Sequence, residues 1–432
     1  MAGLAALIAA GGAQCASASA IRPLHRFCKV NDCQDGEQPG PLARDGDGNL
    51  FGIANGGARG AGLVFELSPQ PGKVRWKYKV IHAFCQLNGC LDGEQPPYAR
   101  LVVDVHGNVY GAAQSGGVGG EGVVFELSPA GAGRWTYSVV YSFCSRINCR
   151  DGMLPAGGLT YAGAQAGLPY DGRSRLYGVT QEGGGHDAGV AYWLRPRSGS
   201  SWYENVIYAF CARKQSCPDG AQPSTGMTLD AAGDLFGVTA LGGATDSGVA
   251  FELVAPPPGH RDWTQMVLHS YCMLARCADG NGEFSELLED SAGNLYGTTR
   301  FGGTGSRCTN AAFGCGIIYE IAADATFTKL YDFCSLANCA DGGDPENLGG
   351  LVLDGSGDLF GTTTQTDNVD GGTIFEFSGG SYRVLYSFCQ TGVCRDGSVP
   401  AAGLLPDSSG GFFGTTASGG SYNGGVAFEF SP

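Results

Sequence analysis

The sequence predicts an all-β fold, a single seven-bladed β-propeller over residues 21–432. Seven copies of one unit follow each other along the chain, and each unit reads as four short strands joined by tight turns. The two chain ends together supply one complete unit. Glycine accounts for 74 of 432 residues and occurs among many Val, Phe, Tyr and Thr residues, so it indicates turns between strands rather than disorder.

Cysteine pairs mark the seven units. Each pair follows an aromatic residue and is itself followed by Asp-Gly, with four or five residues between the two cysteines. Zinc sites usually have two residues between their cysteines, and the chain has just six histidines to complete such sites. We therefore expect local disulfides formed in an oxidising compartment. The expected pairs are Cys28–Cys33, Cys85–Cys90, Cys144–Cys149, Cys211–Cys217, Cys272–Cys277, Cys334–Cys339 and Cys389–Cys394, with an eighth, Cys308–Cys315, inside the fifth unit.

Every unit runs through the same four expected strands. An apolar strand ending in Asp, as at 101–104, leads through a tight turn into a second strand that carries a Tyr/Phe-Gly dipeptide, as at 109–111. A glycine-rich loop precedes the third strand, typified by 122–127, and the fourth strand alternates aromatic residues, as at 135–143. Four short strands joined in this way form one propeller blade.

The two ends of the chain complement each other. The last unit stops after its third strand, at 425–430, and lacks a fourth. Residues 21–28 align with the fourth strand and first cysteine at 383–389. We expect the N-terminal strand to complete the last blade, because ring closure protects the strand edges that an open array exposes.

The cycle of Tyr-Gly-Thr-Thr, Gly-Gly and Gly-Val-x-Phe-Glu-Leu resembles the GloVer tandem repeat of bacterial exported proteins. The resemblance covers nearly the whole chain after residue 20. It departs from the family pattern in that a cysteine pair replaces a Gly/Asp-rich turn, and we expect no C-terminal anchor after Pro432. The resemblance implies a propeller-like fold and export, and it assigns no activity.

Charge and the N-terminus bound the location and the partners. Residues 1–20 are uncharged, rich in small apolar residues and end in Ala-Ser-Ala-Ser-Ala, which predicts a signal peptide and a secreted, periplasmic or cell-surface protein. Cys15 is either lipidated or removed with this segment. No later stretch is apolar enough to predict a transmembrane helix. The formal charge of −15 disfavours nucleic acid and anionic lipid as partners, and we expect a monomer.

The repeated acidic residues are interpreted as structural. An active site needs differentiated groups in one place, whereas Asp beside Gly is ordinary turn chemistry. The Asp-x-x-Gly-Asn/Asp elements at 290–294 and 354–358 resemble fragments of calcium loops but lack the remaining oxygen ligands, so they predict hairpin turns. No cofactor and no metal centre are predicted, although structural calcium is compatible with these turns. The two repeated sets are Asp35, Asp92, Asp151, Asp219, Asp279, Asp341 and Asp396, and Glu66, Glu126, Glu252, Glu320, Glu376 and Glu429.

Positions where one unit departs from the others are the candidate functional residues. The residue before the first strand is glycine in four units, but Arg100 in the second and Glu286 in the fifth. The loops after the cysteine pairs and the Gly-Gly loops lie on one propeller face, around one mouth of the central channel. The candidate catalytic residues are Glu286, Arg100, Glu283, Glu94 and Glu37, and the candidate ligand-binding residues are Gln38, Gln95, Asp344, Arg300 and His186.

Three functions are consistent with these patterns. The first is a secreted recognition propeller that binds an extracellular glycan or an exported protein at the channel mouth. The second is a glycoside hydrolase or polysaccharide lyase that uses the carboxylates and arginine named above. The third is a structural component of the envelope or matrix, in which these residues are solvated loop charges. A fold does not supply a function, and the sequence contains no established catalytic motif.

Overall fold

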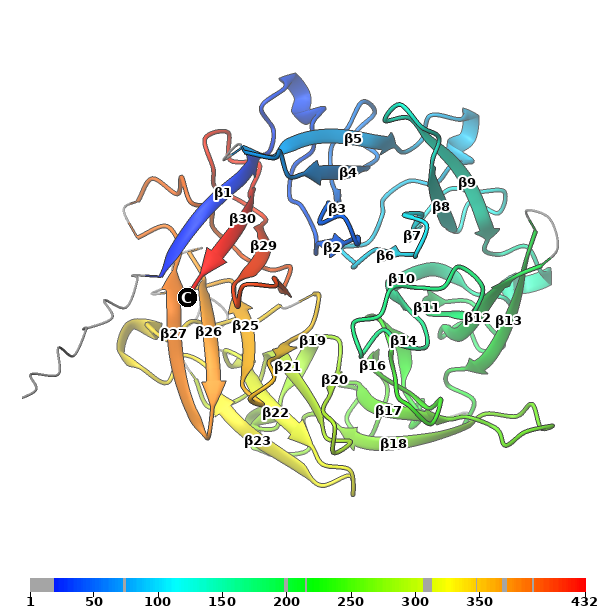
Figure 1. Cartoon of the computed structure of the whole chain (residues 1–432). Helices are drawn as coiled ribbons and strands as arrows, with labels where there is room; N and C mark the ends of the chain where they lie inside the picture. The colour runs from blue at the N-terminus through cyan, green and yellow to red at the C-terminus, as the bar shows by residue number, and fades with distance from the viewer. Residues whose placement is uncertain are drawn as a thin grey trace, which may run out of the picture.

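A computed structural model of the chain describes residues 19–72, 75–197, 201–213, 216–305, 313–346, 348–366, 371–390 and 392–432, apart from the side chains of residues 283 and 284. The fold is a ring of seven antiparallel sheets (Figure 1). This confirms the predicted seven-bladed β-propeller. The first blade contains β2 (Ala43–Arg44), β3 (Leu50–Ala54), β4 (Leu63–Ser68) and β5 (Lys77–Ala83). The second contains β6 (Val102–Val103), β7 (Val109–Ala113), β8 (Val123–Pro129) and β9 (Trp135–Ser142). The third contains β10 (Met153–Thr160), β11 (Leu176–Glu182), β12 (Val190–Pro196) and β13 (Trp202–Ala209).

The fourth and fifth blades have their first strand in two pieces, both paired with the second strand. The fourth contains β14 (Ala221–Pro223), β15 (Thr228–Leu229), β16 (Leu235–Leu241), β17 (Val249–Val254) and β18 (Thr264–Ser270), and the fifth contains β19 (Asn281–Phe284), β20 (Leu288–Glu289), β21 (Leu295–Phe301), β22 (Ile317–Ile321) and β23 (Phe327–Asp332). The sixth contains β24 (Val352–Leu353), β25 (Leu359–Thr363), β26 (Thr373–Ser378) and β27 (Ser381–Ser387).

The seventh blade closes the ring. It contains β28 (Leu404–Pro406), β29 (Phe412–Thr416) and β30 (Val426–Ser431), and its outer strand is β1 (Ala20–Arg26). β1 pairs antiparallel with β30, from Ala20 opposite Ser431 to Arg26 opposite Val426, so the blue and red strands lie side by side in Figure 1. The prediction that the N-terminal strand completes the last blade is therefore confirmed.

One aromatic contact recurs in every blade and explains the Tyr/Phe-Gly motif. The aromatic residue before each first cysteine is buried and contacts a third-strand aromatic ring, as Phe84 contacts Phe125 with ring centroids 5.3 Å apart. The ring of Phe125 lies over Gly111 of the second strand, where an added Cβ would come within 2.7 Å of it. A side chain at Gly111 would displace this ring, so the motif requires glycine there.

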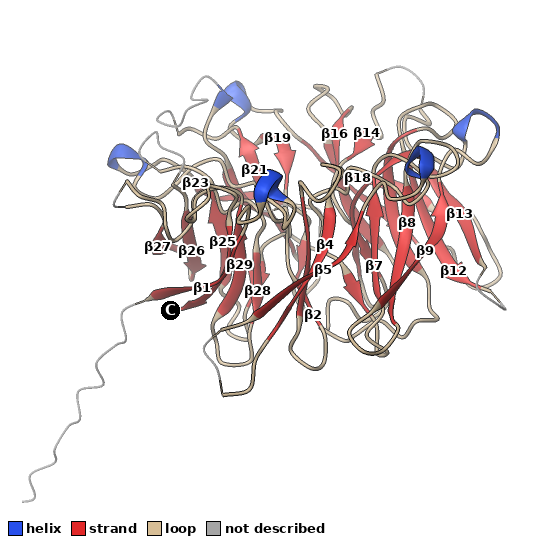
Figure 2. Ribbon diagram, turned by 90° about the horizontal axis from the view of Figure 1, so that it is seen from above, coloured by secondary structure: helices blue, strands red, loops and turns tan. Residues whose placement is uncertain are grey.

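All seven disulfides predicted for the repeat units are present. Cys315 is also disulfide-bonded, while Cys308, its expected partner, lies outside the described residues, as does Cys15. The 3₁₀ helices η1 (Asn31–Cys33), η2 (Asn88–Cys90), η3 (Ile147–Cys149), η4 (Ala275–Cys277) and η6 (Ala337–Cys339) belong to these loops, which lie along one face of the ring (Figure 2). We call them the Cys loops.

An aspartate holds each Cys loop, and six of the seven are buried. Asp92, 1% exposed, accepts hydrogen bonds from the backbone N–H groups of Gln86 (2.9 Å) and Leu87 (3.0 Å). The equivalent aspartates accept backbone N–H groups in the same way, so this seven-fold set is structural, as the sequence indicated. No helix in the described part of the chain is long and apolar enough to cross a membrane.

The fourth strand carries a histidine or tyrosine beside each of these aspartates. His82 Nε2 lies 3.4 Å from an Asp92 oxygen, and its ring stacks on Tyr137 of the next blade at 4.0 Å. Burial lowers the pKa of His82 to about 4, an effect that the Asp92 charge opposes. Tyr141 takes the same place in the next blade and donates its hydroxyl to Asp151 at 2.8 Å. His82 therefore packs between its aspartate and an aromatic ring of the next blade.

Candidate functional site

Arg100 and Glu286 replace the usual glycine just before the first strands, and both side chains reach the backbone of other blades. A Cβ added to Gly226 would lie 2.2 Å from Glu286 Oε1, and one added to Gly158 would lie 3.1 Å from the same atom. A Cβ on Gly349 would lie 3.2 Å from Arg100 Nη2. The glycines therefore leave the space that the two charged side chains occupy, and we call this set of residues the constriction.

Arg100 extends from the second blade to the sixth and seventh. Its Nη2 donates hydrogen bonds to the backbone carbonyl oxygens of Gly349 (3.1 Å) and Leu404 (3.0 Å). Burial lowers the pKa of Arg100, and the nearby Glu286 carboxylate acts in the opposite direction. The guanidinium thus donates hydrogen bonds to carbonyl groups of two other blades. Buried backbone carbonyl groups need such hydrogen-bond donors.

Glu286 extends from the fifth blade to the third and fourth. Its Oε1 accepts a hydrogen bond from the backbone N–H of Gly158 at 3.3 Å, and the N–H of Gly226 also bonds to this carboxylate. Burial raises the pKa of Glu286, against the opposing effect of Arg100. No ion pair within 4.0 Å joins Arg100 to Glu286, although both side chains are described. Each charge is held by backbone groups on its own side of the channel.

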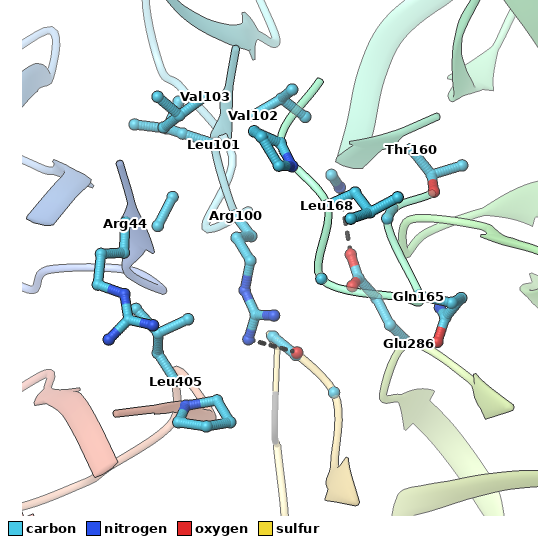
Figure 3. Close-up of a pocket in the computed structure, with 18 of the residues that line it drawn as sticks. Arg44, Arg100, Leu101, Val102, Val103, Thr160, Gln165, Leu168, Glu286 and Leu405 are labelled. Carbon is cyan, nitrogen blue, oxygen red and sulfur yellow. Dashed lines mark hydrogen bonds between the residues drawn. The ribbon is translucent and has the colours of Figure 1, made fainter. Parts of the chain in front are cut away.

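A cavity of about 840 Å³, the lumen, lies on one side of the constriction. Figure 3 shows Arg100 and Glu286 facing this space together with Arg44, Gln165, Leu168 and Leu405. Its lining includes the turn 45–48 between β2 and β3 and the longer segment 161–169 between β10 and β11. Turns between first and second strands lie on the face opposite the Cys loops, because each first strand starts at the Cys-loop face. The lumen is therefore reached from that opposite face.

A second cavity of about 390 Å³, the mouth pocket, lies on the Cys-loop face of the constriction. The chain passes directly from one cavity to the other, since Thr225 lines the mouth pocket and Met227 lines the lumen. None of the described residues that line the mouth pocket is charged. Its polar side chains are those of Asn55, Gln95, Tyr98, Gln114, Ser224 and Thr225, beside Pro96 and Pro97.

A hydrogen-bonded group fixes Tyr98 at this pocket. The Tyr98 hydroxyl and the Asn55 amide both donate to Gln38 Oε1 at 3.0 Å, and the Asn55 amide also contacts the Tyr98 hydroxyl oxygen. Burial raises the pKa of Tyr98, and the Glu37 carboxylate raises it further, so the phenol is neutral at physiological pH. Glu346 adds to the same effect. The surroundings of Tyr98 are therefore polar, with negative charge nearby.

The structure places two predicted ligand-binding glutamines at or beside the mouth pocket. Gln95 lines it, and Gln38 contacts two of its residues. Glu37 and Glu94, one residue earlier in each loop, place a carboxylate oxygen 3.4 and 3.5 Å from a disulfide sulfur of Cys33 and Cys90. Neither glutamate lines either cavity. Arg100 and Glu286 are on the lumen side, so the predicted catalytic residues are not gathered around one cavity.

The remaining predicted residues are dispersed. Asp344 is fully buried and accepts the Gln365 side-chain amide at 2.8 Å, and Arg300 pairs with Glu346 at 3.0 Å. His186 is exposed in the loop between β11 and β12, and the side chain of Glu283 lies outside the described part. The catalytic and ligand-binding roles of these residues stay predictions, as does structural calcium. The Asp290 carboxylate accepts hydrogen bonds from Ala292, Asn294 and Tyr296 within its turn.

Sequence reasoning missed two groups of residues that build these cavities. Tyr98 was not singled out, although it follows the Gln-Pro-Pro segment of a deviant loop. The segment 161–169 was also missed, and it places Gln165 and Leu168 in the lumen. Its signal was the spacing of 67 residues between Cys144 and Cys211, the longest between successive units.

Residues 279–432 carry the Gloeobacter/Verrucomicrobia repeat. This match confirms the resemblance found in the sequence, and the seven-bladed ring fits the propeller-like nature expected of the repeat. No curated protein matches the chain.

Solved structures that are similar to this chain include the following three. An ulvan lyase, a polysaccharide lyase, has 8% identity and a TM-score of 0.46 over 91% of this chain and 93% of that chain. The propeller domain of the trilobed protease from Pyrococcus furiosus has 6% identity and a TM-score of 0.45 over 91% and 94%. An α-L-arabinanase from Penicillium chrysogenum has 11% identity and a TM-score of 0.42 over 85% and 97%. At these values the likenesses indicate nothing about the activity of this chain.

Proposed function

We propose that this chain is an exported recognition propeller that binds a neutral saccharide in the mouth pocket. The observation that carries the proposal is the lining of this pocket, which combines side-chain amides and hydroxyls with no charged side chain among its described residues. Amides and hydroxyls both donate and accept hydrogen bonds, as sugar hydroxyls do. Pockets of a few hundred Å³ with a few converging polar groups are typical ligand sites.

The electrostatics favour a neutral sugar over an acidic one. Glu37 and Glu346 both lie close enough to Tyr98 to raise the pKa of its phenol, and the Glu346 charge is paired with Arg300. A uronate in the mouth pocket would therefore meet the Glu37 carboxylate without a free cation beside it among the described lining residues. Like charges at short range disfavour binding. The ring of Tyr98 and the two prolines supply the apolar surface on which the face of a sugar packs.

Export is part of this proposal. Seven disulfides in one chain are typical of proteins that fold in oxidising compartments, where polysaccharides of the envelope and surroundings are also found. The disulfide Cys85–Cys90 lies just before the pocket residues 95–98 and restrains that segment, which reduces the ordering cost of binding.

The proposal is tested by a binding screen of the purified chain on immobilised neutral and acidic glycans, followed by calorimetry with the soluble oligosaccharides that score. We expect binding to neutral saccharides and weaker or no binding to their uronic-acid counterparts. The same samples are assayed for new reducing ends and for unsaturated uronate, which report hydrolase and lyase activity. Binding confined to acidic glycans, or to none, would contradict the proposal.

A further inference from the structure

The lumen contains two opposite charges that are held apart. Arg100 is anchored to carbonyl groups of the sixth and seventh blades, and Glu286 is anchored to N–H groups of the third and fourth. Opposite charges in a partly buried space attract strongly, because the local dielectric constant is well below that of water. The backbone bonds prevent the two side chains from closing on each other, so a polar gap is built into the channel.

Arg100 keeps hydrogen-bonding capacity that the channel wall does not use, because its Nε is buried without a hydrogen-bond partner. The hydrogen bonds of Arg100 use Nη2, and no described residue accepts a hydrogen bond from its Nη1. The Glu286 carboxylate accepts hydrogen bonds from the N–H groups of Gly158, at Oε1, and of Gly226, and a carboxylate has about four acceptor sites in all. Both residues line the lumen (Figure 3). A ligand entering the lumen thus meets one cationic donor and one anionic acceptor.

The lumen wall also carries apolar side chains. Leu168, Leu288, Leu353 and Leu405 come from four different blades and line the same cavity. Leu168, on the segment 161–169 that other blades lack, is 58% exposed. Closure of the ring does not require this exposed leucine, so its apolar side chain is available to contact a ligand in the lumen.

The other charges of the lumen lie toward its opening. Arg44 is exposed and is labelled among the lining residues in Figure 3. The Asp45 carboxylate is engaged by its own turn, where it accepts hydrogen bonds from the N–H of Asp47 at 2.9 Å and of Asn49 at 2.8 Å. Asp47 is exposed at the tip of the same turn. The deep end of the lumen is therefore defined by Arg100 and Glu286.

We propose that the lumen binds a small zwitterion with an apolar side chain, of which an apolar α-amino acid is the simplest. Its carboxylate accepts hydrogen bonds from the Arg100 guanidinium, its ammonium group donates to the Glu286 carboxylate, and its side chain packs on the leucines. A simple anion would be repelled by Glu286, and a simple cation by Arg100. A neutral polyol would leave both charges uncompensated and would cover the leucines with hydroxyl groups.

The test is calorimetric titration of the full chain with four matched probes. L-Leucine carries both charges and the apolar group, 4-methylpentanoate lacks the ammonium group, 3-methylbutylamine lacks the carboxylate, and glycine lacks the side chain. We expect L-leucine to bind at least about tenfold more tightly than each of the other three, because each lacks one recognised group. No binding of L-leucine, or equal binding of L-leucine and 4-methylpentanoate, would overturn the proposal.

Two variants separate recognition from folding. Glu286→Gln keeps an oxygen for the N–H groups of Gly158 and Gly226 but removes the charge, so L-leucine should lose its advantage over 4-methylpentanoate. Leu168→Ser changes an exposed side chain and should weaken L-leucine but not glycine. An unchanged ratio of L-leucine to 4-methylpentanoate in a folded Glu286→Gln variant would contradict the assignment.

The lumen site is independent of the mouth pocket. The two lie on opposite sides of the constriction and are tested with different ligands, so failure of saccharide binding leaves the L-leucine result unaffected. Tyr422→Phe, on the exposed loop before β30, is the control that should leave both titrations unchanged.

Discussion

The buried carboxylate of Glu204 on β13 forms an ion pair with the half-exposed side chain of Arg146 in the third Cys loop, with Oε2 and Nη2 2.5 Å apart. Other blades place a donor at the equivalent position. Tyr137 and Tyr382 donate their hydroxyls to the backbone oxygens of Asp92 and Asp341 at 2.5 Å, and Gln265 donates its amide to Asp219 O at 3.3 Å. An ionised carboxylate cannot donate a hydrogen bond, so Glu204 can replace these donors only in its protonated form.

Glu204 should make stability fall as pH rises toward neutrality. Burial raises the pKa of Glu204 from 4.5 to about 7, against the opposing charge of Arg146. Between these two values the folded state holds a proton that the unfolded chain releases, so the contribution is complete below pH 4.5 and is lost as pH rises through 7. We expect Glu204→Gln to gain roughly 2–3 kcal/mol over the parent chain between pH 4.5 and 8. Urea unfolding of both proteins at each pH measures this difference.

A constant difference between the two proteins across that pH range would show that Glu204 does not titrate as described. The comparison is made pH by pH because histidines titrate in the same range with the opposite sign. Glutamine is the matched replacement, since Gln265 already occupies the equivalent place in the fourth blade.

His82 should make stability fall as pH drops below neutrality. Its pKa is lowered from 6.5 to about 4 because burial disfavours the charged ring. The folded state therefore keeps the ring neutral, and its contribution is complete above pH 6.5 and lost as pH falls through 4. Tyr331 stacks on Tyr382 at 4.1 Å in the equivalent place, so tyrosine fits there. We expect His82→Tyr to match the parent chain at pH 7.5 and to exceed it by about 2 kcal/mol at pH 4. Melting curves that stay superimposed at pH 4 would refute this.

Asp92 and the Cys85–Cys90 disulfide should act on the same loop. Replacing both cysteines by serine should cost about 2 kcal/mol, because a short closed loop removes limited chain entropy. Asp92→Asn should cost about 1–3 kcal/mol through its weakened bonds to the N–H groups of Gln86 and Leu87. Combining the changes should cost less than the sum, since a loop released by one change has less to lose from the other. Strict additivity in denaturant unfolding would show that the two constraints are independent.

The ring should depend on β1. A chain that begins at residue 27 leaves β30 without its antiparallel partner and removes the Arg22–Glu429 ion pair. We expect a loss of more than about 4 kcal/mol and self-association through the bare edge. A chain that begins at Ser19 is the control. Light scattering and thermal unfolding of the two chains test this, and a stable monomer that begins at residue 27 would argue against closure by β1.

The blades were predictable from sequence because their signals are local. The cysteine pairs, the Tyr/Phe-Gly dipeptide and the missing last strand each lie within one repeat, and seven copies reinforce each other. The unusual nature of Arg100 and Glu286 was also visible as a departure from glycine. Their hydrogen bonds were not predictable from the sequence. Arg100 donates to Gly349, which is 249 residues away, and the two residues meet only because the ring closes.

The position of Arg100 and Glu286 relative to the two cavities depends on the same closure. Sequence reasoning grouped them with Glu37 and Glu94 at one mouth, whereas they form the constriction and line the lumen. The charged side chains were easier to notice than the neutral ones. Asn55, Tyr98 and Gln114 resemble ordinary loop residues until folding gathers them around one pocket.

The central claim, that the mouth pocket binds a neutral saccharide, is tested most directly by titrating one saccharide into three proteins. These are the parent chain, Tyr98→Phe and Tyr422→Phe, and the saccharide is the neutral oligosaccharide that binds most tightly in the screen. Tyr98→Phe removes one hydroxyl that the pocket holds in place through Gln38. We predict that this variant binds about tenfold more weakly, and that Tyr422→Phe binds as the parent does. Equal affinity of all three proteins would contradict the claim.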